Sequence, residues 1–173
     1  KHSIFVQSQI PTHFKDFYRA NREAMRRAPG LCVIGELRDQ ETIRAAVELS
    51  LTGHPVFGTV HAKDVAAIMR RMISRFPEQE RATAIYDLVD TSRFMMAQKL
   101  VPTVDGKRTA ARSWLKFTEQ VRDTLMDLTD MGRVTQRVAE FVRDEGHTFA
   151  AEADRLLAAG VINEAAARDL RHG

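Results

Sequence analysis

Apolar and polar residues alternate in blocks along the chain, and these blocks predict a regular succession of strands and helices. A run of consecutive apolar residues, typical of a strand buried on both faces, occupies 31–34, and a second buried strand is predicted over 55–61. Apolar residues at helical spacing predict amphipathic helices over 39–51, from 65 to about 76, and again around 85–89. Strands and helices in this order imply right-handed crossovers and a parallel sheet, so the predicted fold class is α/β.

The chain opens with a run at 3–8 that is typical of a strand already in progress, so we expect a further part of the protein to precede it. An amphipathic helix is predicted over 13–28, stopped by the Pro-Gly pair that follows. The polar face of this helix is basic, and a solvated helix face and a phosphate-binding face both fit that pattern. The basic residues are Lys15, Arg19, Arg22, Arg26 and Arg27.

The pattern changes near residue 95. Strand-like segments at 96–102 and 108–117 flank an Asp-Gly pair, which favours a hairpin, and we expect these antiparallel strands at the edge of the sheet. The rest of the chain is helical in pattern, with short helices predicted around 119–128, 132–144, 148–159 and 163–171. We therefore predict a sheet domain over 1–118 and a small all-helical subdomain over 119–173.

Composition narrows the class of protein. The 173 residues, 44% of them hydrophobic, suffice for one domain with a small appendage, and no apolar run approaches the length of a membrane-spanning helix. The single cysteine, Cys32, lies inside a predicted strand and excludes an internal disulfide. The net charge of +3 is too small for the dense basic field of a dedicated nucleic-acid module.

Candidate chemistry is concentrated in residues 35–61. Glu36 follows the first buried strand, where open α/β sheets place their ligands, and a carboxylate there can orient water for attack on a phosphoryl group. His61 ends the next strand and would emerge near Glu36, while His54 precedes that strand. The alternative interpretation is that Glu36 merely ends a core strand and that His54 and His61 are structural histidines. The chain has no Cys pair and no His-Glu-x-x-His pattern, so the histidines do not predict a metal site.

Two segments carry a resemblance to a known family. Residues 35–44 resemble the atypical Walker B segment, and residues 51–61 resemble the His box, of hexameric secretion-system ATPases of the PilT/GspE/VirB11 type. Further similarity at 75–81, 96–102 and 121–125 extends the resemblance over nearly the whole chain. Residues 109–115 are most similar to the ATPases of type IVB (Dot/Icm-like) secretion and related conjugation systems.

The resemblance implies a role for each matching residue. Glu36 would be the catalytic glutamate that positions water and helps to hold Mg²⁺, and His61 would contact the γ-phosphate region of ATP. Gly35 stands where many other P-loop enzymes have Asp. Arg38 and Asp39 would organise the site or a subunit contact, with the two roles left open. Nucleotide binding would also involve the loop formed by Thr52, Gly53 and His54.

One required motif is missing. Members of this family need a Gly-x-x-x-x-Gly-Lys-Ser/Thr loop, whose backbone amides and Lys hold the phosphates. The only Gly-Lys pair here, Gly106 and Lys107, is followed by Arg108 and falls in the predicted hairpin turn. The resemblance therefore implies the C-terminal half of a RecA-like P-loop domain. We expect residues 1–173 alone not to hydrolyse ATP.

The resemblance further implies a homo-oligomer, a hexamer, working in the cytoplasm at the inner membrane with secretion-machine components. No direct nucleic-acid contact and no transmembrane segment are expected. A pilus-retraction or type II secretion ATPase is the alternative within the family. Outside it, a noncatalytic assembly module and a nucleic-acid-binding module stay open, and a steep loss of DNA affinity with salt would favour the latter.

Overall fold

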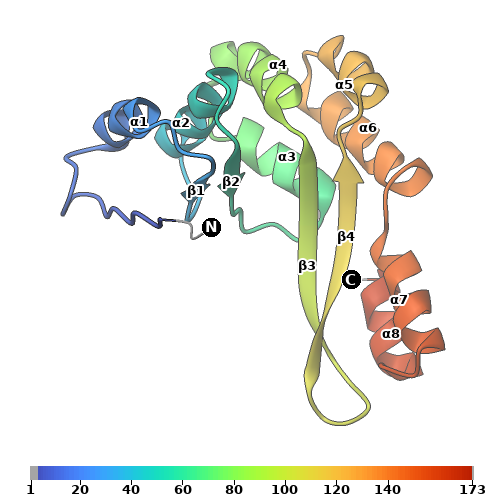
Figure 1. Cartoon of the computed structure of the whole chain (residues 1–173). Helices are drawn as coiled ribbons and strands as arrows, with labels where there is room; N and C mark the ends of the chain where they lie inside the picture. Colours follow the sequence, from blue (N-terminus) through green and yellow to red (C-terminus); the bar gives the residue numbers. More distant parts are fainter. Residues whose placement is uncertain (1–3, 173) are drawn as a thin grey trace. The chain divides into compact units, whose positions relative to one another are not determined.

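The computed structural model describes residues 4–172, and its chain forms two compact units, 1–60 and 61–173. The first unit is built from two helices and two short strands (Figure 1). Its strands β1 and β2 pair in parallel, with Cys32 opposite Val56 and Ile34 opposite Gly58. In order, these elements are α1 (Phe17–Arg26), β1 (Cys32–Ile34), α2 (Gln40–Leu51) and β2 (Val56–Gly58). The parallel pairing confirms the predicted strand–helix–strand crossover.

Helix α2 begins and ends where its sequence signals indicate. The Asp39 side chain accepts a hydrogen bond of 2.9 Å from the Thr42 amide, and the Thr42 hydroxyl lies 3.3 Å from the Asp39 amide, which completes a capping box. At the other end Gly53 has φ +87°, the left-handed conformation that favours glycine. Local polar side chains and one glycine are therefore enough to set the limits of this helix.

The first unit corrects two predictions about strands. Residues 4–8 form no strand, because no neighbouring strand among the described residues pairs with them; the remaining residue of that prediction, Ser3, lies outside the described residues. The predicted burial of both strand faces is also wrong. Ile34 is buried against α2, but Val33 is 69% and Phe57 65% exposed, because the small core of this unit lies on one face of the strand pair.

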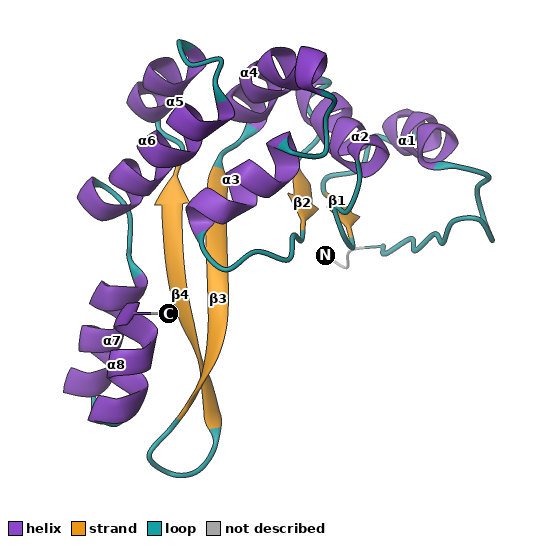
Figure 2. Cartoon of the chain, turned by 180° about the vertical axis from the view of Figure 1, so that it is seen from behind, coloured by secondary structure: helices purple, strands orange, loops and turns teal. Residues whose placement is uncertain are grey.

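The second unit combines a long antiparallel hairpin with helices (Figure 2). Its strands β3 (Phe94–Pro102) and β4 (Arg108–Lys116) pair along their whole length. The helices are α3 (Val65–Ile73), a short 3₁₀ turn η1 (Glu78–Glu80), α4 (Arg81–Thr91), α5 (Glu119–Met126), α6 (Met131–Asp144), α7 (Phe149–Ala158) and α8 (Glu164–His172). The hairpin and all four C-terminal helices were predicted, and these predictions are confirmed.

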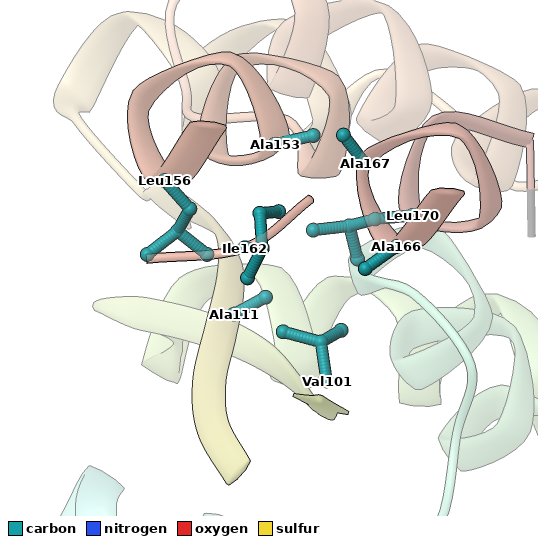
Figure 3. Close-up of a cluster of buried hydrophobic side chains, with 8 residues drawn as sticks. All are labelled: Val101, Ala111, Ala153, Leu156, Ile162, Ala166, Ala167 and Leu170. Carbon is teal, nitrogen blue, oxygen red and sulfur yellow. The ribbon is translucent and has the colours of Figure 1, made fainter. Parts of the chain in front are cut away.

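The sequence pattern predicts the hairpin strands at the edge of the parallel sheet, and this prediction is wrong. In the part of the chain that the structure describes, β3 and β4 form a sheet of their own and share no ladder with β1 or β2. One hairpin face is covered by helices instead. Figure 3 shows Val101 of β3 and Ala111 of β4 facing apolar residues of the helical pair α7 and α8. The helices predicted as a small subdomain therefore share a core with the hairpin, and the boundary at 118/119 stays a prediction.

The buried carboxylate of Glu152 in α7 is linked to the hairpin through His147. Glu152, 4% exposed, accepts hydrogen bonds from Arg155 Nε at 2.8 Å and Arg155 Nη2 at 2.9 Å, and lies 3.0 Å from His147 Nε2. His147 in turn exchanges two backbone hydrogen bonds of 2.9 Å with Trp114 of β4 and stacks on its indole ring. The Arg155 hydrogen bonds, then that of His147, lower the pKa of Glu152 from its ordinary 4.5 to about 2.

We expect Gly146→Ala to destabilise the second unit by about 1–3 kcal/mol, because overpacking displaces well-packed atoms. A Cβ at residue 146 would lie 2.5 Å from the Trp114 carbonyl oxygen and 3.0 Å from Val142 backbone atoms, none of which is a flexible side-chain end. Urea unfolding followed by the fluorescence of Trp114, the only tryptophan, measures the change. Gly132→Ala in α6 is the control, because its Cβ would approach a single side-chain atom, the Asp130 oxygen that caps α6, at 3.1 Å and no backbone atom. Equal stability of the two variants would contradict the prediction.

Candidate functional site

Glu36 lies two residues beyond the end of β1 and is half-buried. Both of its chain neighbours are bonded to Thr59, which follows β2. The Thr59 hydroxyl donates to the Gly35 carbonyl oxygen, and the Leu37 amide donates to the Thr59 carbonyl oxygen at 2.9 Å. The backbone on either side of Glu36 is therefore held by one residue of the neighbouring segment, at the carboxyl end of the strand pair.

Gly35 leaves space beside this carboxylate. It is exposed, and a Cβ added to it would meet no atom within 4 Å. The residue therefore does not serve close packing in the described chain. Backbone without a side chain at this point admits a ligand close to the main chain next to Glu36.

Arg38 and Asp39 have different tasks. Asp39 caps α2, and its pKa is lowered first by the hydrogen bond from the Thr42 amide and then by those from the Thr42 and Arg38 side chains. Arg38 Nε lies 3.2 Å from the Asp39 carboxylate, and its side chain is 68% exposed. Since the Asp39 side chain accepts from the Thr42 amide at the start of α2, this N–H group is not open to a phosphate.

Thr52, Gly53 and His54 lie at the other end of the strand pair. The Thr52 hydroxyl donates to the carbonyls of α2 that end the helix, and its oxygen lies 3.2 Å from His54 Nδ1. The strand register places His54 two residues before β2, whereas Glu36 is two residues past β1. Continuing this register places Glu36 level with residue 60, six residues after His54. At about 3.3 Å per residue of extended chain, Glu36 and His54 are separated by about 20 Å along the strand pair. The structure thus gathers Gly35, Glu36 and Arg38 but not Thr52, Gly53 and His54.

His61 is the first residue of the second unit and is exposed. It follows Thr59 by two residues and precedes Asp64, whose carboxylate accepts a 2.7 Å hydrogen bond from the Ala67 amide and caps α3. The capped helix therefore begins almost immediately after His61, which limits the freedom of the segment that carries the imidazole.

The Gly-Lys pair is confirmed as part of a hairpin turn. Gly106 has φ +79°, and its amide donates to the Thr103 carbonyl oxygen at 3.1 Å. Lys107 Nζ pairs with the Asp105 carboxylate at 3.2 Å, and β4 begins at the next residue. A phosphate loop leads into a helix rather than a strand, so this turn is not one.

No preformed metal cage exists in residues 4–172, where no group of three or more His, Cys, Asp or Glu side chains could hold a metal ion. Mg²⁺ usually keeps several waters and is held by one or two carboxylates together with nucleotide phosphates. The carboxylate of Glu36 beside the open Gly35 fits a Mg²⁺ ion that arrives with a nucleotide, whose phosphates and waters would supply the other ligands.

Thr59 is the site residue that reasoning from the sequence missed. It was seen only as part of a strand that ends in His61. A register assignment could have found it, because Cys32 opposite Val56 places Thr59 alongside the residues that follow β1. That register depends on the tertiary pairing of two short strands, which the residue pattern does not specify.

A search of protein families matches residues 2–158 to the type II/IV secretion system protein family. The chain belongs to this family. Its predicted resemblance to secretion ATPases of the PilT/GspE/VirB11 type is thereby confirmed, as is the mixed α/β fold class.

Solved structures support the assignment. The family member described here superposes on the ATPase DotB of Yersinia pseudotuberculosis with a TM-score of 0.91 and 52% identity, covering 98% of this chain and 44% of that one. DotB of Legionella pneumophila gives 0.88 and 42%, covering 95% of this chain and 44% of DotB. ADP-bound PilT, a pilus retraction motor, shares the fold at a TM-score of 0.81 and 24% identity, covering 97% of this chain and 47% of PilT.

Among curated relatives, the type IV pilus retraction ATPase PilT of Pseudomonas aeruginosa is 32% identical over 127 residues, which are 73% of this chain and 37% of PilT. The chain therefore spans well under half of the relatives it matches. In the described residues, no helix has the length and apolar character needed to cross a membrane.

Proposed function

We propose that this chain forms part of an ATP-hydrolysing motor subunit of a type IVB-like secretion or conjugation system. The observation that carries the proposal is its 52% identity to a DotB ATPase over nearly its whole length, with Glu36 fixed at the carboxyl end of the parallel strands. A pilus-retraction or type II secretion motor is the second candidate, favoured by the 32% identity to PilT.

In this proposal Glu36 orients the water that attacks the terminal phosphoryl group and accepts its proton as the bond forms. Catalysis of phosphoryl transfer is largely positioning and electrostatic stabilisation, so a carboxylate with a fixed backbone suits the task. His61 approaches the γ-phosphate region and donates a hydrogen bond to its oxygens. Glu36 would also help to hold a Mg²⁺ ion through water, and the ion would supply charge neutralisation.

We propose a narrower set of nucleotide-binding residues than the resemblance implies. Gly35 and Arg38 lie beside Glu36 in the chain and in the structure, and we propose them as nucleotide-side residues. Thr52, Gly53 and His54 act instead through the fold, by ending α2 and setting the start of β2, because they lie at the opposite end of the strand pair.

The phosphate loop and further site residues would come from the part of DotB-like proteins that this chain does not span. Assembly into a homo-oligomeric ring, a hexamer, at the cytoplasmic face of the inner membrane belongs to the same proposal. Hydrolysis would then be converted into relative motion of domains that act on secretion-machine components.

The test compares purified residues 1–173 with the longer protein that includes the phosphate-loop part. We expect phosphate release from ATP by the longer protein and none above background by residues 1–173, because the phosphates lack their cradle of amides and Lys. Turnover by residues 1–173 that Glu36→Gln abolishes would contradict the proposed division of the site. Absence of ATP hydrolysis in the longer protein would contradict the proposed function itself.

A further inference from the structure

Regular pairing between β1 and β2 ends too early to hold the carboxylate by itself. The last ladder pair is Ile34 with Gly58, and Glu36 comes two residues later. The intervening Gly35 is exposed and has the widest backbone freedom of any residue type. Something beyond the ladder is needed if the Glu36 side chain is to keep one direction.

Thr59 supplies that restraint with two different groups. Its hydroxyl donates to the carbonyl oxygen of Gly35, just before Glu36, and its own carbonyl oxygen accepts from the amide of Leu37, just after it. Because the two bonds fall on opposite sides of Glu36, they restrict rotation of both peptide planes that flank this residue. Thr59 thus extends the strand pairing past the end of the ladder.

Side-chain packing strengthens the same restraint. A Cβ at Gly58 would lie 2.6 Å from Leu37 Cδ1, so the Leu37 side chain rests directly on the glycine that precedes Thr59. Gly58 and Thr59 together therefore hold the residue after Glu36 by a contact and a hydrogen bond. Both belong to the segment that leads on to His61.

We propose that Thr59 is a positioning residue for Glu36. Its hydroxyl, bonded to the Gly35 carbonyl, orients the carboxylate that directs water onto the terminal phosphoryl group. The proposal rests on the proposed ATPase function. A displacement of about 1 Å in a reacting group can cost about 100-fold in rate, so loss of this hydrogen bond has a measurable consequence for turnover.

The experiment uses the full ATPase, with the phosphate-loop part included, and measures phosphate release from ATP. Thr59→Val removes the hydroxyl at constant side-chain shape, and we expect kcat to fall about 10- to 100-fold with KM for ATP changed less than about twofold. Thr59→Ser keeps the hydroxyl and is expected to retain kcat within about threefold of wild type. Thr124→Val, which removes a similar Thr-to-carbonyl bond in α5, is the matched control and leaves kcat unchanged.

A double-mutant cycle separates positioning from simple stabilisation. If Thr59 acts through Glu36, Thr59→Val has less than about a twofold effect on the residual rate of the Glu36→Gln protein. Equal losses in Thr59→Val and Thr59→Ser, a wild-type kcat in Thr59→Val, or a full additional loss on top of Glu36→Gln would each overturn the proposal. If Glu36→Gln is as active as wild type, the catalytic assignment of Glu36 fails together with it. If Glu36→Gln loses activity while Thr59→Val keeps the wild-type kcat, only the role of Thr59 fails.

Discussion

Under the proposed function, Glu36→Gln is expected to lower kcat for ATP hydrolysis by the full ATPase about 100- to 10,000-fold, the range typical of losing a general base. The amide has nearly the shape of the carboxylate but accepts no proton and offers less charge to orient the attacking water. The two Thr59 hydrogen bonds on either side of Glu36 are made to the Gly35 carbonyl and the Leu37 amide, so the substitution leaves them in place. Phosphate release at saturating ATP measures the loss.

ATP binding is expected to persist in the Glu36→Gln protein, because water orientation matters in the transition state more than in the ground state. Glu23→Gln is the control, since the Glu23 side chain on α1 is 43% exposed and pairs with Arg26 at 3.3 Å. A Glu36→Gln protein whose kcat stays within about threefold of wild type would exclude Glu36 as the catalytic carboxylate.

Glu152→Gln is expected to remove about 3 kcal/mol of stability from the second unit at neutral pH. The pKa of Glu152 is lowered from 4.5 to about 2, and each unit corresponds to about 1.4 kcal/mol. The carboxylate is 5% exposed, so solvent screens its interactions little. A glutamine retains the size of the side chain but cannot hold the Arg155 guanidinium as an ion pair.

The lowered pKa fixes the direction of the pH dependence. The stabilisation by Glu152 is fully present above pH 4.5 and is lost as the pH falls toward about 2, because the unfolded chain takes up the proton first. Urea unfolding monitored by Trp114 fluorescence from pH 6 to pH 2 should show the wild type and Glu152→Gln converging in acid. The exposed Glu145→Gln serves as the control. A difference between wild type and Glu152→Gln that grows in acid would refute the assignment.

Local sequence signals determined the helices and the hairpin of this protein. Asp39 and Gly53 set the limits of α2, and the turn at Gly106 joined the hairpin strands. These signals act over a few residues, through a side chain that bonds a nearby amide or a glycine that adopts positive φ. The position of Glu36 just after a strand follows from the same local pattern.

Tertiary structure alone decided burial, strand register and the composition of the site. The apolar run at 31–34 predicted a strand buried on both faces, but Val33 is exposed, because burial depends on which elements pack against each face. Register placed Thr59 beside Glu36 and put His54 about 20 Å away along the strand pair, although both belong to one continuous motif in the sequence. The residue types near Glu36 can be inferred from sequence, but pairing between strands selects which of them bond to the backbone on either side of it.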